Sequence, residues 1–189
     1  MRKGNLFVIS GPSGAGKGTL VARLLQEVPD SWLSVSATTR SPREGEVHGV
    51  HYYYMDRDAF MERAGNGEFL EWAEYSGNCY GTPLASVLEK IEQGKQVVLE
   101  IDVQGAFQIR EKIPEAHLVF IEPPSLEELE KRLVNRGTED AQTVRRRMEA
   151  AKLELSRKEE YDYRLVNDDL EEAAAQLVAY VNEQANTTK

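Results

Sequence analysis

The feature that most constrains this chain is a glycine-rich loop close to its first residues. Residues 11–17 read Gly-Pro-Ser-Gly-Ala-Gly-Lys, which fits the pattern G-x-x-x-x-G-K. An apolar run over residues 5–10 precedes the loop, and apolar residues at helical spacing follow it from Thr19 to Val28. A buried strand, a glycine loop and a helix in this order predict the phosphate-binding start of an α/β domain.

The composition of this loop has a chemical reason. Glycines let successive backbone N–H groups turn toward a polyphosphate, and the start of the following helix adds its dipole. We expect Lys17 to place its charge on the β- and γ-phosphates. The alternative is a glycine-rich turn followed by a surface lysine. The expected nucleotide-binding residues are Gly11, Pro12, Ser13, Gly14, Ala15, Gly16, Lys17, Gly18 and Thr19.

One position departs from the pattern. Gly18 follows the lysine where a serine or threonine usually ligates Mg²⁺, and Thr19 comes one residue later. We therefore expect Mg²⁺ to be held by water and by the substrate phosphates, which suits this strongly hydrated ion. The order Lys-Gly-Thr is similar to that in adenylate kinase loops and favours phosphoryl transfer between nucleotides over a switch GTPase.

The rest of the chain alternates strands with helices. Apolar runs predict strands over 96–103, 116–121 and 164–166, and helical patterns lie over 105–112 and 169–184. This order predicts an α/β fold with a mostly parallel sheet covered by helices on both faces.

Two segments break this alternation. Short β-rich stretches between residues 35 and 80 predict a small, partly antiparallel insertion, closed by a helix over 83–93. From the capping box at 125–128, two charged helices around Gly137, the second reaching Tyr161, predict a helical lid. We expect one domain overall, with core segments 1–34, 95–124 and 157–189, the insertion at 35–94 and the lid at 125–156.

Length and composition limit the number of domains, the classes of partner and the cellular compartment. A length of 189 residues suits one domain of roughly 100–200 residues. The net charge of −9 argues against a general nucleic-acid binder. A single cysteine, Cys79, needs no oxidising compartment, no apolar run reaches the roughly 18 residues of a membrane span, and no signal peptide is evident. We expect a cytoplasmic protein without nucleic-acid or membrane partners.

Arginines gather in two places, at 40–43 and at 132–147. These arginines could bind a small anionic ligand, or they could be solvated charges paired with the many glutamates, and composition alone leaves both interpretations open.

The residues that carry a family resemblance are the segments 36–46, 71–74, 77–82, 101–105 and 135–138, together with Tyr52 and the phosphate loop. In these residues the chain closely resembles the guanylate kinase family of the P-loop NTPase superfamily. This resemblance covers nearly the whole chain. It implies transfer of the γ-phosphoryl group of ATP to GMP, giving ADP and GDP in purine nucleotide metabolism, with Mg²⁺ as cofactor and ATP and GMP as partners. It leaves the oligomeric state open.

The resemblance also implies an acceptor-phosphate site. Arg40 and Arg43, joined through Pro42, carry guanidinium groups that can clamp a phosphate dianion between them. Hydroxyl donors at matching positions are Ser36, Tyr52 and Tyr80. The alternative for these tyrosines is core packing, which we prefer for Tyr53 and Tyr54.

Recognition of the base is implied for Glu71 and Thr82. Guanine presents N1–H and N2–H₂ side by side, and one ionised carboxylate can accept both hydrogens, whereas adenine offers no such pair. The alternative for Glu71 is a carboxylate on a surface strand. By resemblance, Asp102 belongs to the guanosine and Mg²⁺–water network. Glu100, two residues earlier, is expected to face the same side of its strand as a weaker neighbour.

The lid arginines Arg136 and Arg147 match the family and would join Lys17 and Arg40 in neutralising charge during transfer. Asn167 is expected on the adenine side of ATP. Two other functions remain to be weighed. A guanylate-kinase-like binding module without turnover is disfavoured by the intact Gly16 and Lys17. A kinase for another nucleoside monophosphate is disfavoured by the Glu71–Thr82 pair.

Overall fold

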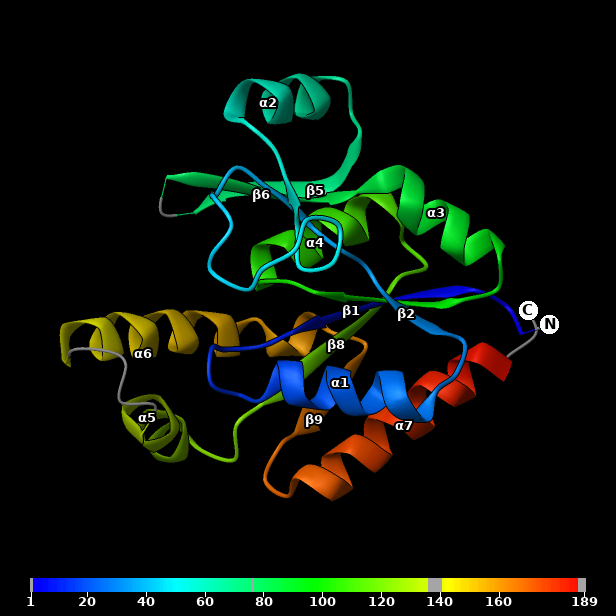
Figure 1. Cartoon of the computed structure of the whole chain (residues 1–189). Coiled ribbons are helices and arrows are strands. Elements are labelled where there is room, and N and C mark those ends of the chain that lie inside the picture. The colour runs from blue at the N-terminus through cyan, green and yellow to red at the C-terminus, as the bar shows by residue number, and fades with distance from the viewer. Residues whose placement is uncertain (1, 76, 136–140, 187–189) are drawn as a thin grey trace.

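The computed structural model describes residues 2–75, 77–135 and 141–186 (Figure 1). A short 3₁₀ turn, Lys158–Glu160, lies between the sixth helix and the last strand. In chain order the strands and α-helices are β1 (Asn5–Ser10), α1 (Lys17–Glu27), β2 (Ser31–Leu33), β3 (Ala37–Thr38), β4 (Tyr53–Tyr54), α2 (Arg57–Gly65), β5 (Phe69–Tyr75), β6 (Asn78–Pro83), α3 (Leu84–Glu92), β7 (Gln96–Glu100), α4 (Val103–Lys112), β8 (His117–Glu122), α5 (Leu126–Asn135), α6 (Ala141–Ser156), β9 (Tyr163–Val166) and α7 (Leu170–Asn186).

The central layer is a parallel sheet with the strand order β2-β7-β1-β8-β9. β1 runs parallel to β7 on one side and to β8 on the other, and the outer pairs are parallel as well. β1 is buried along its whole length, and β8 along nearly all of it. Burial on both faces explains why these strands are continuous apolar runs instead of alternating ones. The predicted α/β class with a parallel sheet is confirmed.

Helices cover both faces of this sheet (Figure 1). α1 and α7 lie on one face, where Leu24 and Ile9 belong to the same core. α3 and α4 lie on the other, where Ile109 and Val8 belong to a second core. Val8 and Ile9 are neighbours on β1, and their separation into opposite cores follows from the alternation of side chains along a strand.

A second, smaller sheet lies over the α4 side of the central sheet, with α2 beyond it (Figure 1). Its strand order is β4-β3-β6-β5, in which β6 is antiparallel to both neighbours and β3 is parallel to β4. Its core is small: Phe60 of α2 stacks on Phe69 of β5 with 4.5 Å between the ring centroids. This mixed sheet agrees with the partly antiparallel character predicted for residues 35–80.

Three of these elements are not predicted by the sequence. α2 is capped by Asp56, whose carboxylate accepts a hydrogen bond from the backbone N of Ala59 at 2.8 Å. β6 contains a glycine and a proline, and it forms because β5 and β3 pair with its two edges. At Gly81 a Cβ atom would lie 3.0 Å from that of Trp72, so glycine allows the close approach. β2 is a short, half-buried edge strand.

The segment predicted as a lid forms the helices α5 and α6, which lie together at one end of the central sheet (Figure 1). α5 begins as predicted, because Ser125 Oγ accepts a hydrogen bond from the backbone N of Glu128 at 3.0 Å. The Glu128 carboxylate lies against Arg132 at 3.4 Å, so the reciprocal half of the predicted capping box is replaced by an ion pair. α6 ends at Ser156, before the predicted Tyr161, because the 3₁₀ turn leads the chain toward β9.

Cys79 is a free, buried thiol in the core of the second sheet. Within the described ranges, the helices are too short or too polar for any of them to pass through a lipid bilayer.

Replacing Leu24 with alanine is expected to lower the free energy of unfolding by about 2–5 kcal/mol, because the side chain is fully buried and its removal leaves a cavity. Leu153 on α6 is the matched control, since it is 72% exposed. The same substitution there should change stability by less than about 0.5 kcal/mol. Urea unfolding of both variants measures the difference, and equal losses would contradict the burial described.

Candidate active site

Connections that follow three strands meet at one edge of the central sheet. Parallel strands all end at the same edge, and this is where such sheets bind ligands. The glycine loop follows β1, Asp102 comes two residues after β7 ends, and Asn167 directly follows β9. Residues far apart in the sequence are therefore gathered around a single loop.

The backbone of the glycine loop is shaped to expose its amides. Gly16 caps the start of α1 in a left-handed conformation, with φ at 92°, which side chains rarely tolerate. A Cβ atom there would also overlap Nδ2 of Asn167. Lys17 Nζ donates to the carbonyl oxygens of Gly11 at 2.6 Å and Pro12 at 3.2 Å. The lysine ammonium thus lies over the loop that is predicted to bind phosphates.

Asn167 ties the loop to the last strand. Its Nδ2 donates to the carbonyl oxygen of Ala15 at 2.8 Å, and the residue is only 6% exposed. Its backbone N donates to the carbonyl oxygen of Glu122 at 2.8 Å, which fixes it to the end of β8. The placement of Asn167 on the adenine side of ATP stays a prediction, and the structure shows in addition that its amide holds the loop.

The two lid helices contact the same loop. Arg147 Nη1 of α6 donates to Ser13 Oγ at 2.8 Å. Arg132 Nη2 of α5 donates to the carbonyl oxygen of Asn167 at 3.1 Å. Arg136, the other predicted lid cation, lies outside the described residues. The described part of the lid therefore brings one arginine to the loop and another to Asn167, which holds the loop.

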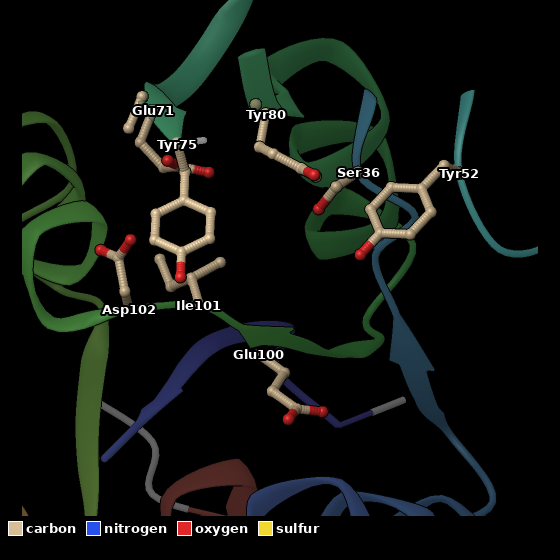
Figure 2. A pocket seen from close by; sticks show the side chains of 10 residues that line it. Ser36, Tyr52, Glu71, Tyr75, Tyr80, Glu100, Ile101 and Asp102 are labelled. Atoms are coloured by element: carbon tan, nitrogen blue, oxygen red, sulfur yellow. The ribbon is translucent and has the colours of Figure 1, made fainter. Parts of the chain in front are cut away.

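A pocket opens between the two sheets (Figure 2). The predicted residues Ser36, Tyr52, Glu71, Tyr80 and Asp102 all line it. Figure 2 shows the hydroxyls of Ser36, Tyr52 and Tyr80 at one end, and Glu71 and Asp102 at the other. The pocket is thus divided into an end rich in hydroxyl donors and an end rich in carboxylates. The remaining lining residues are Ala73, Tyr75, Gly81, Glu100 and Ile101.

Glu71 is a buried carboxylate held in one orientation. It is 6% exposed, and Thr82 Oγ1 donates to its Oε1 at 2.6 Å across the β5–β6 pair. Gly105 of α4 leaves room for the other oxygen, because a Cβ there would lie 3.1 Å from Oε2. Burial raises the pKa of Glu71, and the hydrogen bond from Thr82 opposes that rise only in part. Such a carboxylate is a strong, directional acceptor for a ligand that presents N–H groups.

The expectation that Glu100 and Asp102 share a face is wrong. β7 ends at Glu100, so its alternation does not extend to Asp102, which instead caps α4 and accepts a hydrogen bond from the backbone N of Gly105 at 2.7 Å. Figure 2 shows the two side chains pointing in opposite directions. Burial raises the pKa of Glu100, and the charge of Lys17 opposes this. Asp102 therefore lies in the pocket beside Glu71, whereas Glu100 lines the same pocket with its carboxylate directed toward Gly18.

Arg40 lies at the hydroxyl end of the pocket. Its guanidinium carbon is 5.4 Å from the ring centroid of Tyr52. Nη1 and Nη2 each donate to one oxygen of Glu46 at 2.9 Å, and this pairing raises the pKa of Arg40 above its usual value. Arg43 is exposed, and its backbone N donates to Glu46 Oε2 at 2.7 Å. The structure thus shows Arg40 beside the ligand pocket and also paired with a glutamate.

Tyr53 and Tyr54 have different environments. Tyr53 packs against the core of the second sheet, as predicted. Core packing is wrong for Tyr54, whose hydroxyl donates to Glu46 Oε2 at 2.8 Å. The two are neighbours on β4, so their side chains must point to opposite faces.

Sequence reasoning assigned no role to Glu46, Tyr75 or Arg132. Tyr75 was accessible to prediction, because it follows Glu71 by four residues on β5 and strand alternation puts both on the pocket face. Arg132 and Glu46 carry no comparable signal. Glu46 is positioned by a contact across a turn, and Arg132 by a contact with Asn167, the residue after β9.

The site offers carboxylate oxygens that suit a hard cation. Within residues 2–75, 77–135 and 141–186, His, Cys, Asp and Glu form no group of three or more that could hold a metal ion. A cation here would therefore need additional oxygen ligands from water or a bound phosphate.

Comparisons with known proteins agree on one family. A family model described as guanylate kinase matches residues 3–184. The chain is 54% identical to a guanylate kinase of Streptomyces coelicolor over 177 residues, which is 94% of this chain and 90% of that one. It is 53% identical to a guanylate kinase of Streptomyces kasugaensis over 95% of this chain and 88% of that one. A crystal structure of guanylate kinase from Anaplasma phagocytophilum superimposes with a TM-score of 0.79 at 35% identity, covering 99% of this chain and 89% of that one.

Replacing Glu71 with glutamine is expected to stabilise the fold at neutral pH. The pKa of Glu71 is raised in the folded state, so the ionised carboxylate costs stability as the pH rises through that pKa. Below the ordinary value of 4.5 the carboxyl is protonated in both states and the advantage should vanish. Melting temperatures across this pH range measure the effect, with Glu62→Gln at an exposed position of α2 as control. A variant less stable than the wild type at neutral pH would contradict this account.

Proposed function

The chain belongs to the guanylate kinase family, and on that premise we propose how its residues carry out the ATP-dependent phosphorylation of GMP. The observation that carries the proposal is the pairing of two half-sites at one sheet edge. A glycine loop with its lysine lies on one side, and a pocket with a buried Glu71–Thr82 pair lies on the other. The first suits a polyphosphate donor and the second suits a guanine-containing acceptor.

Guanine binds at the carboxylate end of the pocket. Its N1–H and N2–H₂ groups donate to Glu71, which Thr82 orients, and Asp102 lies beside them. A buried carboxylate that finds no donors loses its hydrogen bonds and its solvation together, so the site rejects a base that presents acceptors there. This preference disfavours AMP and the pyrimidine nucleotides as acceptors.

The GMP phosphate lies at the hydroxyl end, among Ser36, Tyr52 and Tyr80, with Arg40 and Arg43 as the cationic clamp. Arg40 already lies over Tyr52. Arg43 is exposed, and we assign its side chain to the same phosphate. Because the GMP phosphate is already ionised, it needs no general base before one of its oxygens attacks the γ-phosphorus of ATP.

ATP binds along the phosphate loop, from Gly11 to Thr19, with Lys17 on its β- and γ-phosphates. Asn167 supports this half-site by holding the carbonyl of Ala15, which keeps the neighbouring amides directed at the phosphates. As the bond from the γ-phosphorus to the leaving ADP oxygen breaks, negative charge spreads over the transferred group. Lys17, Arg40, Arg147 and Arg136 are the cations that we assign to stabilise it.

Mg²⁺ is the cofactor that we propose, held mainly by the substrate phosphates and by water. Gly18 supplies no hydroxyl, but the residues nearby fit a hydrated cation. The carboxylate oxygens of Glu100 lie 3.7 Å from the place of a Cβ at Gly18, and Asp102 has a second oxygen besides the one that caps α4. When bound, the ion would neutralise phosphate charge. We assign Asp102 and, secondarily, Glu100 to its water shell.

Contacts between the lid and the loop support a closing role for α5 and α6. Closure would bring Arg147 to the reacting phosphates and expel water that would otherwise hydrolyse ATP.

We also propose the division of the chain that the sequence predicts, with core segments 1–34, 95–124 and 157–189, a GMP-binding insertion at 35–94 and a lid at 125–156. The substrates are cytoplasmic nucleotides, and we propose that the protein works there.

A coupled assay of ADP formation with ATP and a panel of monophosphates tests this function. GMP should be turned over far better than AMP, CMP or UMP. Binding of GMP without ADP formation would support the binding-module alternative, and a preference for another monophosphate would overturn the acceptor assignment.

Replacing Lys17 with alanine is expected to lower kcat by about 10²–10³-fold, because a preorganised cation that meets charge developing in the transition state contributes about that much. The loop should keep its shape, since its glycines and Asn167 remain. Steady-state kinetics measure the loss, with Lys152→Ala on the exposed surface of α6 as control. Unchanged turnover would remove Lys17 from the mechanism.

Replacing Glu71 with glutamine should lower kcat/KM for GMP by at least about 10²-fold while ATP affinity stays the same, because the amide presents N–H groups to the guanine donors. Together with the stability gain expected at neutral pH, this separates loss of recognition from loss of folding. Equal weakening of GMP and ATP binding would contradict the assignment of Glu71 to the base.

A further inference from the structure

The turn that carries the proposed phosphate clamp is organised around a carboxylate to which the mechanism above gives no role. We propose that Glu46 is a positioning residue for the GMP phosphate, because it fixes the Arg40 guanidinium and the Arg43 backbone while leaving one edge of Arg40 open to the ligand. This inference rests on the proposed function, since it concerns the acceptor half of the same site.

Both oxygens of Glu46 accept hydrogen bonds from neighbouring groups. Oε1 accepts from Arg40 Nη2 at 2.9 Å. Oε2 accepts from Arg40 Nη1 at 2.9 Å, from the backbone N of Arg43 at 2.7 Å and from the Tyr54 hydroxyl at 2.8 Å. The backbone N of Glu46 donates in return to the carbonyl oxygen of Arg43 at 3.0 Å. A single side chain therefore joins both clamp arginines and β4 into one unit.

The pattern of donors shows which edge of Arg40 remains for a ligand. A guanidinium has five N–H groups. Nη1 donates to the carbonyl oxygen of Ser41 at 2.8 Å and to Glu46, which uses both of its hydrogens, and Nη2 uses one for Glu46. These three hydrogen bonds use neither Nε–H nor the second hydrogen of Nη2. Together they form the side edge of the guanidinium, which can bind two oxygens of one phosphate.

A restrained arginine binds more tightly than a mobile one, because less side-chain freedom is lost when the ligand arrives. Arg40 is restrained by its paired bonds to Glu46 and by the ring of Tyr52 beneath it. The hydrogen bonds that Glu46 accepts from Arg40 and from the Arg43 backbone lower the pKa of Glu46 to about 2. The carboxylate therefore keeps its charge throughout the neutral range.

Electrostatic repulsion and positioning predict opposite effects of removing the Glu46 charge on GMP binding, so an experiment can distinguish them. Glu46 is a negative charge close to the place assigned to a phosphate dianion, so removing that charge should strengthen GMP binding if only the Coulomb energy mattered. If Glu46 acts by positioning, removing it should weaken GMP binding. In Glu46→Gln the new amide N–H₂ would face donors that now meet a carboxylate oxygen, so the bonds to Arg40 and Arg43 cannot all form.

The experiment compares Glu46→Gln with Glu44→Gln in the full chain. Glu44 lies in the same turn and is exposed, so its substitution removes the same charge without touching the clamp. We expect Glu46→Gln to raise the KM for GMP by about tenfold or more, as the loss of charge-assisted hydrogen bonds would, with a smaller change in kcat and the KM for ATP unchanged. Glu44→Gln should leave the KM for GMP within about twofold of the wild-type value, because exposed charges interact weakly.

Inhibition by guanosine, which lacks the phosphate, separates a positioning role from a merely structural one. Structural damage to the site would weaken guanosine binding, whereas loss of phosphate positioning would not. Its inhibition constant against GMP should be the same in Glu46→Gln and in the wild type. Tyr54→Phe is the second variant: it removes one donor to Glu46, keeps the charge, and should raise the KM for GMP in the same direction by a smaller factor.

A lower or unchanged KM for GMP in Glu46→Gln would overturn the proposal, and so would guanosine binding that weakens as much as GMP binding. Failure of the wild-type chain to phosphorylate GMP would instead overturn the proposed function. The two failures are therefore distinguishable in one set of measurements.

Discussion

Repulsion between two phosphorylated substrates is the constraint on which this site depends, and a chain of net charge −9 has no general excess of positive charge to offset it. The structure supplies directed donors instead. Backbone amides at the start of α1 and Lys17 lie on one side, Arg40 lies on the other, and Arg147 of the lid bonds to Ser13 of the loop. Because parallel strands end at one edge, the same sheet that buries the core brings these groups into one region.

The acceptor pocket illustrates the conflict between recognition and stability. Glu71 is buried, its pKa is raised, and a neutral side chain would cost the fold less. The carboxylate is retained at a place where Thr82 and the absence of a side chain at Gly105 hold it in one orientation. On the proposed assignment of Glu71 to guanine, its charge becomes favourable when the ligand brings N–H donors, so the free energy given up in folding would be recovered in selectivity.

Periodicity and motif order predicted much of this structure, and the failures have physical causes. The interior strands β1 and β8 of the central sheet were predictable, because burial on both faces makes them uniformly apolar. β6 was not, because its glycine and proline suit a strand only once β5 and β3 pair with it. The orientation of Asp102 depended on where β7 ends, and the partners of Glu46 depended on a turn that returns the chain to Arg40. Local patterns predict elements, whereas contacts across turns decide which groups meet.

The hydrogen bond from Asn167 to Ala15 has a consequence for synthesis of the chain. The loop leaves the ribosome well before the amide that fixes it, because Asn167, directly after β9, follows Ala15 by 152 residues. A nascent polypeptide therefore carries a nucleotide-binding motif whose geometry is incomplete until residue 167 has emerged. On the proposed assignment of ATP to this loop, tight binding of ATP by the nascent chain is expected only after the whole sheet can form.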